Sequence, residues 1–174
     1  MLGDGTLGEG VVYESLNIAS LWGLPILFVL ENNRYAQTTP IEMNLAGKIG
    51  RRFRAFDIET VEMDTTDVLE IRAATAALAA AIRSSGKPRA QVIHTYRLAP
   101  HSKGDDFRDA AEIERFRELD PISIIRRKLT AGEWEQARET ARREVEGAYR
   151  KAESDPWPQA SSLAEVRMDA GPAP

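Results

Sequence analysis

The pattern of hydrophobic and polar positions near the N-terminus predicts a helix followed by a strand. Apolar side chains recur at i, i+4 and i+7 over residues 9–23, which is the spacing of an amphipathic helix, and Gly23 and Pro25 end it. The next run, PILFVLE at 25–31, is almost entirely apolar and contains β-branched and aromatic residues. Such a run is typical of a strand that is buried on both faces of a parallel sheet.

The same alternation of helix and strand patterns continues along the chain. The further elements expected are a short basic helix over 44–54, a strand over 57–63, an alanine-rich helix capped by Thr65 or Thr66, and a strand over 90–97. Alternating strands and helices favour an α/β fold, in which a mostly parallel sheet carries flanking helices. Ligands of such sheets bind beyond the carboxyl ends of the strands, so we expect the functional site among the loops that leave the strands there.

The C-terminal part of the chain shows helical patterns without strands. Helices are expected over 110–119, 121–130 and 133–153, and Pro121 suits the first turn of the second one. From Asp155 on, Pro, Gly, Ala and Ser predominate, which is typical of a poorly ordered segment. The sequence therefore predicts an α/β domain over 1–109, a helical segment of the same domain over 110–154, and a flexible tail over 155–174.

Composition narrows the functional classes. The 174 residues include no cysteine, which excludes disulfides, thiolate metal sites and cysteine nucleophiles. The formal charge of -4 argues against broad nucleic-acid binding, and the basic runs at 51–54 and 125–129 are expected to be solvated helix faces. The longest apolar run, at 24–30, is too short to span a bilayer, and the N-terminus lacks a signal-peptide pattern. We therefore expect a cytoplasmic protein with no membrane partner.

The stretch GDGTLGE at 3–9 is the first candidate for chemistry. Gly3 and Gly5 permit a sharp turn and a close approach of the backbone to a ligand, and the following helix would direct N–H groups toward it. Asp4 would repel a bare phosphate. A cation between carboxylate and phosphate removes that conflict, because Mg²⁺ prefers one or two carboxylates together with phosphate oxygens. Read without a ligand, GDG is an ordinary turn signal.

A second polar loop should lie next to this turn. Residues 6–31 separate Gly5 from Asn32, which is enough chain for one helix and one strand that return to the same edge of the sheet. Asn32 and Asn33 then offer amide oxygens, which are hard and neutral ligands. One Asp and one Asn around a Mg²⁺ bound to a diphosphate form a coherent site, whereas NN alone would be a turn.

These motifs resemble those of a known family. GDG followed by an Asn pair is similar to the thiamine diphosphate motif, and the segment from Gly3 to Ala36 resembles the alpha subunit of the decarboxylating component of 2-oxo acid dehydrogenases. That family includes pyruvate, branched-chain and acetoin dehydrogenases. HTYRLAPHSKGDD at 94–106 resembles its second signature, a loop beside the cofactor. The similarity extends from Gly3 to about Leu129.

The resemblance assigns roles to individual residues. The metal ligands it implies are Asp4, the Asn33 side chain and the Tyr35 carbonyl, and the cofactor contacts it implies are Gly3, Gly5, Thr6, Arg97 and His101. His101 would lie near the reacting end of the cofactor, where a neutral imidazole suits proton transfer. Arg97 would contact a phosphate or brace the loop. Ser102 matches a serine that is phosphorylated in mitochondrial relatives, but it is expected to be an ordinary loop serine, and His94 is expected to be structural.

In this family a long N-terminal segment precedes the strand that leads into GDG. We therefore expect a thiamine diphosphate-binding fold without its N-terminal strands, completed by a separate chain unless the reading frame is truncated. The implied function is oxidative decarboxylation of a 2-oxo acid, with thiamine diphosphate and Mg²⁺, a beta subunit in a heterotetramer, and acyl transfer to a lipoyl acyltransferase. The alternatives are a non-catalytic assembly subunit, a truncated relic, or another split thiamine diphosphate enzyme, against which the loop at 94–106 argues.

Overall fold

The computed structural model describes residues 1–104 and 106–159 and forms two compact units, Met1–Lys128 and Leu129–Pro174. The boundary between the units falls inside the helical segment 110–154 rather than at its start. Helices α5 (Ala110–Arg117) and α6 (Pro121–Lys128) belong to the unit of the sheet, and α7 (Ala131–Ser154) belongs to the other. Most of the tail expected over 155–174 lies outside the described residues.

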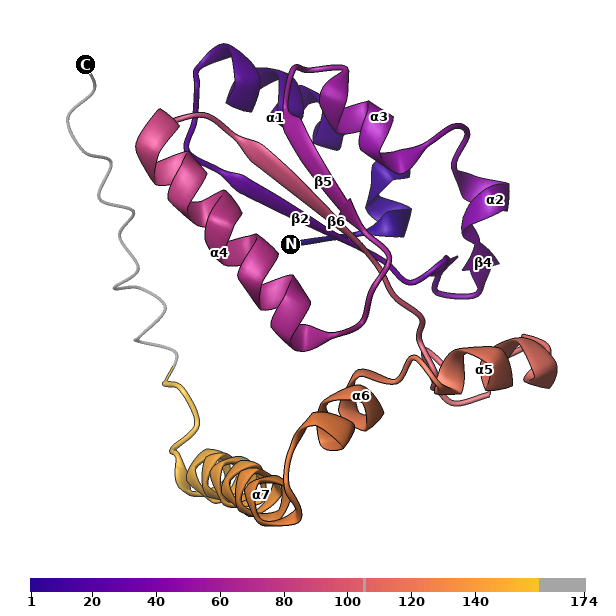
Figure 1. The fold of residues 1–174 in the computed structure, drawn as a ribbon, viewed down its shortest axis with the longest axis vertical. Coiled ribbons are helices and arrows are strands. Elements are labelled where there is room, and N and C mark those ends of the chain that lie inside the picture. The colour runs from indigo at the N-terminus through magenta and orange to yellow at the C-terminus, as the bar shows by residue number, and fades with distance from the viewer. Residues whose placement is uncertain (105, 160–174) are drawn as a thin grey trace. The chain divides into compact units, whose positions relative to one another are not determined.

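The first unit is built on a four-stranded parallel sheet (Figure 1), which confirms the predicted α/β class. The strand order is β1-β2-β6-β5, so that β6 lies between β2 and β5. The strands are β1 (Leu2–Gly3), β2 (Leu27–Asn32), β5 (Glu59–Met63) and β6 (Arg89–His94). Their register places Gly3 beside Glu31 and Asn32 beside His94, so the polar loops leave the sheet at one edge.

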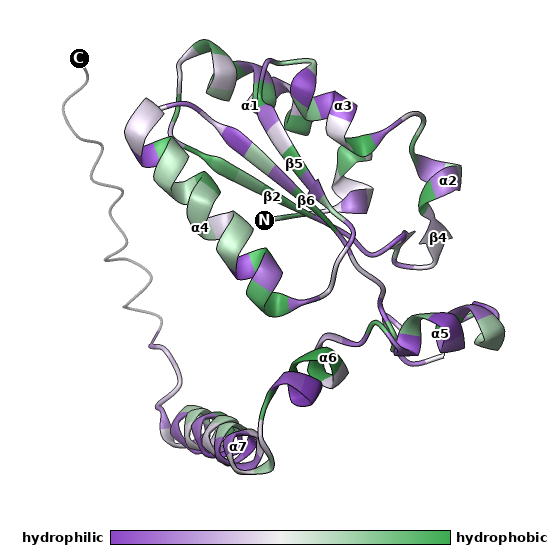
Figure 2. Cartoon of the chain, viewed as in Figure 1, coloured by the Kyte–Doolittle hydropathy of each residue, from purple (hydrophilic) through white to green (hydrophobic). Residues whose placement is uncertain are grey.

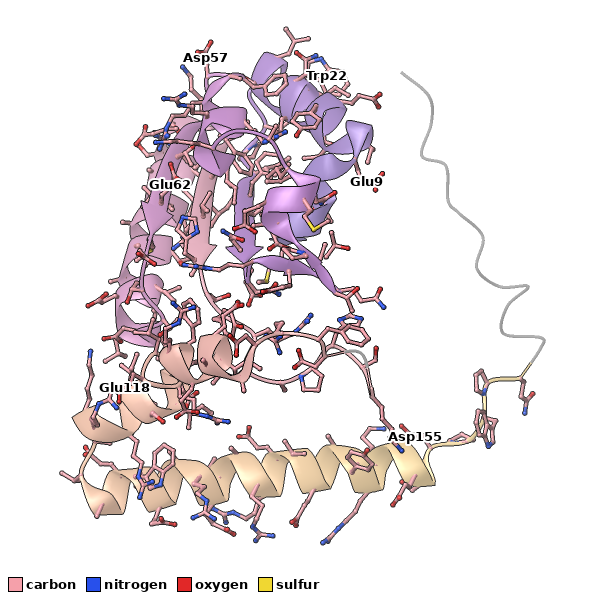
Figure 3. All side chains as sticks on the ribbon, turned by 90° about the vertical axis from the view of Figure 1, so that its right-hand side faces the viewer. Glu9, Trp22, Asp57, Glu62, Glu118 and Asp155 are labelled. Carbon is pink, nitrogen blue, oxygen red and sulfur yellow. The ribbon has the colours of Figure 1, made fainter. Side chains whose placement is uncertain are left out.

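Helices cover both faces of this sheet. Figure 1 shows α4 (Val68–Ser85) across one face, and α1 (Gly10–Leu21) and α3 (Ile49–Arg54) over the other. Glu9 and Trp22, labelled in Figure 3, flank the two ends of α1. The remaining elements are short: the 3₁₀ helix η1 (Asp4–Gly8), the antiparallel strands β3 (Tyr35–Ala36) and β4 (Thr39–Pro40), and α2 (Ile41–Asn44).

Apolar side chains from distant parts of the sequence form the core between the sheet and the helices α1 and α3. Leu7, Leu16 and Phe53 are fully buried there, together with Leu30 and Val92 from the sheet. Figure 2 shows β2 as a mostly hydrophobic strand, as expected for a strand covered on both faces. At about 25 cal/mol per Å² of apolar surface removed from water, these side chains supply the main driving force for folding.

The structure differs from the sequence expectations at several helix ends. The alanine-rich helix is capped by Asp67, whose carboxylate accepts the Leu69 N–H, and not by Thr65 or Thr66, so that prediction was wrong. Instead, the Thr65 hydroxyl accepts the Asp67 N–H. The basic helix expected over 44–54 is shorter in the structure: α3 covers only Ile49–Arg54, and Gly47, with a left-handed φ of 77°, precedes it.

The second unit contains α7, which begins with a capping box. The Thr130 hydroxyl accepts the Glu133 N–H, and the Glu133 carboxylate accepts the Thr130 N–H, so that each satisfies an N–H group at the helix start. No described residue of α7 is buried. Within the described part of the chain, no helix has the length and apolar content needed to cross a membrane.

Candidate functional site

Asp4 stands at the carboxyl end of β1 and is buried, with 3% of its surface exposed. Its Oδ1 accepts the Gly5 N–H at 2.8 Å. Burial raises the pKa of Asp4 above its usual value of 3.8, hydrogen bonds from the backbone amides of Gly5 and Arg34 oppose that rise, and the charge of Glu31 adds to it. Burial is the largest of these effects, so the site disfavours the negative charge unless a cation compensates for it.

Gly5 is required by the closeness of a second loop. A Cβ atom added at Gly5 would stand 2.7 Å from the Cβ of Ala36, a distance that real Cβ contacts essentially never show. The turn after β1 and the turn after β2 therefore touch at the backbone level. The Thr6 hydroxyl donates to the Gly3 carbonyl oxygen at 2.5 Å and fixes the first turn internally.

The turn after β2 is organised by its two asparagines. The Asn32 Oδ1 accepts the Arg34 N–H at 3.1 Å, and the Asn33 Oδ1 accepts the Tyr35 N–H at 3.0 Å. Arg34 is left-handed, with a φ of 72°, a conformation that few residues other than Gly, Asn and Asp adopt readily. Consecutive Asx turns hold this conformation and direct the Arg34 amide toward Asp4.

These residues fit a hard cation. The Asp4 Oδ2 is buried and has no hydrogen-bond partner in the structure, an arrangement that costs free energy in a folded protein. The part of the chain described contains no group of three or more His, Cys, Asp and Glu side chains around one point, so a site rich in carboxylates is absent there. One carboxylate with amide and carbonyl oxygens, completed by phosphate oxygens, is instead a donor set that suits Mg²⁺.

The Tyr35 side chain is held by helix α5. Its hydroxyl donates to Glu112 Oε1 at 2.8 Å, and the Tyr96 hydroxyl donates to the same carboxylate oxygen at 2.9 Å. Burial, followed by the hydrogen bond to Glu112, raises the pKa of Tyr35 to about 12. Tyr96 also stacks on Phe116 with ring centroids 4.0 Å apart, so α5 is fastened to the loop that carries Tyr35.

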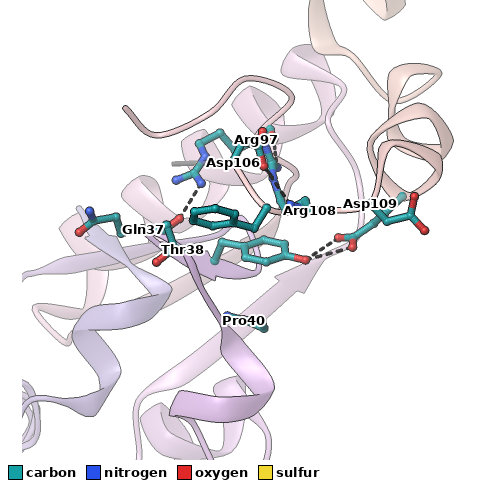
Figure 4. Close-up of a pocket in the computed structure, with 10 residues that line it drawn as sticks. Gln37, Thr38, Pro40, Arg97, Asp106, Arg108 and Asp109 are labelled. Carbon is teal, nitrogen blue, oxygen red and sulfur yellow. Dashed lines mark hydrogen bonds and ion pairs between the residues drawn. The ribbon is translucent and has the colours of Figure 1, made fainter. Parts of the chain in front are cut away.

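Arg108 fixes the loop over residues 98–109. Its guanidinium pairs with Asp106 at 2.7 Å, donates to the carbonyl oxygens of Arg97 and Ala99, and lies over the rings of Tyr35 and Tyr96. The hydrogen bond from Arg108 lowers the pKa of Asp106 to about 2. Figure 4 shows these groups around a cavity of about 290 Å³. Its lining residues are Tyr35, Gln37, Thr38, Pro40, Arg97, Asp106, Phe107, Arg108, Asp109 and Glu112.

The predicted site residues divide into two groups. Asp4, Gly5 and the turn that carries Asn33 and Tyr35 are brought together at the carboxyl edge of the sheet, with Gly3 and Thr6 in the same first turn. Arg97 and His101 lie in the other loop. Arg97 donates to the Gln37 carbonyl oxygen at 2.7 Å and so braces the loop (Figure 4). His101 is exposed, and within the described residues no hydrogen bond or ion pair joins it to Asp4.

Sequence reasoning did not single out three residues that shape this region. Ala36 has no chemical signature, and only its closeness to Gly5 gives it importance. Glu112 looks like any acidic residue in the first turn of a helix, and Arg108 like any loop arginine. Charge pairs between α5 and the loops could have been suspected from the acidic and basic residues of 106–112, but no spacing rule selects these partners.

Comparisons with known proteins show the family to which this chain belongs. The model of the family described as "Dehydrogenase E1 component" matches residues 1–161. The pyruvate dehydrogenase E1 component subunit alpha of Rhizobium meliloti is 34% identical over 173 residues, which cover 92% of this chain and 49% of the relative. The same subunit of Rickettsia felis is 29% identical over 171 residues, covering 93% of this chain and 52% of the relative.

A mammalian relative and a solved structure are also similar. The testis-specific mitochondrial alpha subunit of pyruvate dehydrogenase from Rattus norvegicus is 31% identical over 182 residues, covering 99% of this chain and 46% of the relative. The chain thus spans about half the length of the curated relatives it matches. Among solved structures, transketolase from Leishmania mexicana covers 53% of this chain and 14% of its own, with a TM-score of 0.47 and 25% identity.

A buried aspartate beside an Asn pair at the carboxyl edge of a parallel sheet has the position and the oxygen donors that suit a metal-bound diphosphate. The chain belongs to the dehydrogenase E1 component family, the thiamine diphosphate-dependent 2-oxo acid dehydrogenases, because that family's model matches nearly its whole length. It is similar to the alpha subunits of the pyruvate-specific members. The resemblance inferred from the sequence motifs is thereby confirmed.

Proposed function

We propose that this chain supplies the Mg²⁺–diphosphate half of a thiamine diphosphate site in a 2-oxo acid dehydrogenase. The observation that carries the proposal is the buried Asp4 Oδ2, which has no partner, beside a turn that presents an Asn side chain and a Tyr carbonyl. A buried carboxylate oxygen without a partner costs about 1–3 kcal/mol, and a bound cation would remove that cost. Family membership, which implies thiamine diphosphate, supports the same assignment.

In this proposal each residue has a defined task. Asp4, the Asn33 side chain and the Tyr35 carbonyl would ligate Mg²⁺, while Gly5 and Thr6 would present their backbone to the diphosphate. When bound, thiamine diphosphate would supply the carbanion chemistry for decarboxylation of a 2-oxo acid. Because the carboxylate of Asp4 is held without water, its attraction to the cation is stronger than at a surface.

The loop over 98–109 serves the reacting end of the site. His101 carries the imidazole that donates or accepts a proton as the substrate reacts, since neutral His is suited to proton transfer near pH 7. Arg97 holds this loop against the turn after β3 through the Gln37 carbonyl oxygen. The acyl group produced is then passed to a lipoyl group of an acyltransferase.

The proposed enzyme requires other chains. The names of the relatives designate them as alpha subunits of pyruvate dehydrogenase E1, and a beta subunit in a heterotetramer is therefore the partner proposed for this chain. We propose a cytoplasmic location for the complex.

Calorimetric titration of thiamine diphosphate with Mg²⁺ tests the proposal, on this chain alone and after co-expression with the products of neighbouring genes. We expect binding with the complete complex and a loss of at least about 100-fold in affinity in Asp4→Ala, because a metal ligand is removed. Glu9→Ala, at an exposed position outside the ligand set, is the control and should bind normally. A folded complex that binds no cofactor would instead indicate a non-catalytic assembly subunit.

A further inference from the structure

His94 lies behind the turn that carries the proposed metal ligands, and it accepts a hydrogen bond from the Asn32 side chain. It is the last residue of β6 and stands opposite Asn32 in the register of β2 and β6. Its Nδ1 lies 3.0 Å from the Asn32 Nδ2. The Asn32 side chain is itself buried, so its NH₂ group needs a partner within the protein.

The orientation of the Asn32 amide fixes the protonation of His94. Because the Asn32 Oδ1 accepts the Arg34 N–H at 3.1 Å, the atom that faces His94 must be the Nδ2 donor. The His94 Nδ1 is therefore the acceptor, and the ring carries its proton on Nε2. A doubly protonated ring could not accept this hydrogen bond.

The surroundings of the ring are mixed in charge. On its other side the His94 Nε2 lies 4.0 Å from Glu62 Oε2, and Glu62 (labelled in Figure 3) is paired with Arg54 at 2.9 Å. Arg34, Asp64 and Tyr96 share a small cavity with His94. Glu62 is too far for a normal hydrogen bond and already engaged, so the bond to Asn32 is the short polar contact that determines how the ring is placed.

The hydrogen bonds continue from His94 to the site. His94 holds the Asn32 amide, the Asn32 Oδ1 holds the Arg34 N–H, and Arg34 is thereby kept in its left-handed conformation next to Asp4. Left-handed backbone is unfavourable at a residue other than glycine and persists only where its surroundings enforce it. Asn33 and Tyr35, on either side of Arg34, depend on the same backbone conformation.

We propose that His94 is a positioning residue for the metal-binding turn. As a hydrogen-bond acceptor for Asn32, it holds Arg34 in the conformation that places the Asn33 side chain and the Tyr35 carbonyl toward the cation beside Asp4. The inference rests on the proposed function for its metal, but its structural part, the order of the turn, concerns the metal-free chain as well.

Two substitutions at His94 separate hydrogen bonding from packing. His94→Leu removes the acceptor and keeps a side chain branched at the same carbon, whereas His94→Asn places a carbonyl oxygen where Nδ1 stood. Gln91→Leu is the matched control. Gln91 is fully buried on the same strand, but its hydrogen-bond partners are Thr75 in α4 and Met63 in β5, away from the turn.

Amide hydrogen exchange of the full chain without metal is the first readout. We expect His94→Leu to raise the exchange rate of the Arg34 amide about tenfold, since one buried hydrogen bond is lost, while His94→Asn stays within about twofold of the wild type. Gln91→Leu should lower stability without a selective effect on Arg34. An unchanged Arg34 rate in His94→Leu, or equal effects of Leu and Asn, would overturn the inference.

Binding of Mn²⁺, followed by its electron paramagnetic resonance signal, is the second readout. We expect about tenfold weaker binding in His94→Leu and recovery in His94→Asn. If Asp4→Asn leaves Mn²⁺ binding unchanged, the proposed function fails while the exchange result still decides the positioning role. If His94→Leu does not fold, Asn32→Ala is the second variant. It must raise the exchange rate of the Arg34 amide to a similar extent, and an unchanged rate would overturn the inference.

Discussion

Two loops leave neighbouring strands at the same edge of the sheet, and they are held in different ways. The turn after β2, residues 32–36, is fixed by short contacts: Ala36 meets Gly5, and each asparagine bonds the backbone two residues on. The described residues of the loop over 98–109 are mostly exposed, and arginine side chains hold it: Arg108 donates to the carbonyl oxygens of Arg97 and Ala99, and Arg97 donates to that of Gln37. The first loop is determined by backbone proximity and the second by long, charged side chains.

The difference matches the proposed tasks of the two loops. A metal site needs oxygen atoms at fixed positions, and backbone contacts with short side chains lose little conformational freedom on folding. A loop beside the reacting end of a cofactor must admit a substrate, and a loop held by a few side-chain bonds can open when those bonds break. The predictions below alter one set of contacts at a time.

The largest effect is expected at the contact between the two turns. Gly5→Ala places a methyl group 2.7 Å from the Ala36 Cβ, so the turns must separate, at a cost of about 1–3 kcal/mol in unfolding free energy. Chemical denaturation measures this loss. The double variant Gly5→Ala with Ala36→Gly removes the opposing methyl group and should recover most of the stability. A stable single variant would mean that the turns are not in contact.

A gain in stability is expected for Asp4→Asn in the metal-free chain. Because burial raises the pKa of Asp4 above 3.8, the folded state binds a proton more tightly than the unfolded state. Its contribution to stability is therefore fully present below the unfolded pKa and is lost as the pH rises through the folded pKa.

Removing the charge should raise the metal-free stability at pH 7 by about 1 kcal/mol while abolishing metal binding. Chemical denaturation of the metal-free chain at pH 7 and at pH 4 measures the gain in stability and its pH dependence. The advantage of Asn over Asp must shrink at the lower pH. Lower stability of Asp4→Asn at pH 7 would contradict an uncompensated buried charge.

A smaller effect is expected for Arg108, which should control the loop over 98–109 without affecting the turn after β2. Arg108→Met keeps the volume over the tyrosine rings and loses the ion pair and both carbonyl contacts. Trypsin should then cleave after Lys103, an exposed position in this loop, roughly tenfold faster. Arg108→Lys keeps the charge but lacks the planar donors, so it should restore the resistance only partly.

The same loop should respond to acid. Because Arg108 lowers the pKa of Asp106 to about 2, the contribution of Asp106 to loop order is present above its unfolded pKa of 3.8 and is lost as the pH falls through about 2. Hydrogen exchange of the loop amides, measured at pH values between 3.8 and about 2, reports this loss of order. An equal response in Arg108→Met would show that the ion pair is not its source.

The smallest expected effect is a change in the pKa of a tyrosine, which is followed by ultraviolet absorbance. Glu112→Gln removes the charged acceptor of the Tyr35 and Tyr96 hydroxyls, so the pKa of Tyr35, raised to about 12, should fall toward its usual value of 10. Ultraviolet titration of tyrosinate measures it, with Glu114→Gln on the same helix as the control, since Glu114 pairs with Arg117 at the surface. An unchanged titration would assign the raised pKa to burial alone.

The sequence predicted the strands well because periodicity and apolar runs report local requirements. PILFVLE overlaps β2, although only Leu30 and Asn32 of that strand are buried, and the predicted strands over 57–63 and 90–97 overlap β5 and β6 with ends shifted by a few residues. Pro121 does begin α6, as its fixed φ suggests. Helix caps were harder to predict than strands. Thr65, Thr66 and Asp67 are all good N-cap residues, and only the path of the chain decides which side chain reaches the first free N–H group.

The segment before the first helix contains an element that no sequence pattern predicted. Helix α1 starts at Gly10, within one residue of the expectation, but Asp4–Gly8 form the 3₁₀ helix η1. Glycines at positions 5, 8 and 10 are poor α-helix formers, and the contact of Gly5 with Ala36 confines the chain there. The loop thus follows a tertiary contact that no local pattern records.

The sequence by itself determined the α/β class, the family motif and the positions of Asp4 and Asn33, because spacing along the chain and the ligand chemistry of side chains are local properties. The tertiary structure alone decided which groups meet: Ala36 against Gly5, Glu112 between two tyrosines, and His94 behind Asn32. These contacts join residues far apart in sequence, and their partners are selected by strand order and register, which arise only when the whole sheet forms.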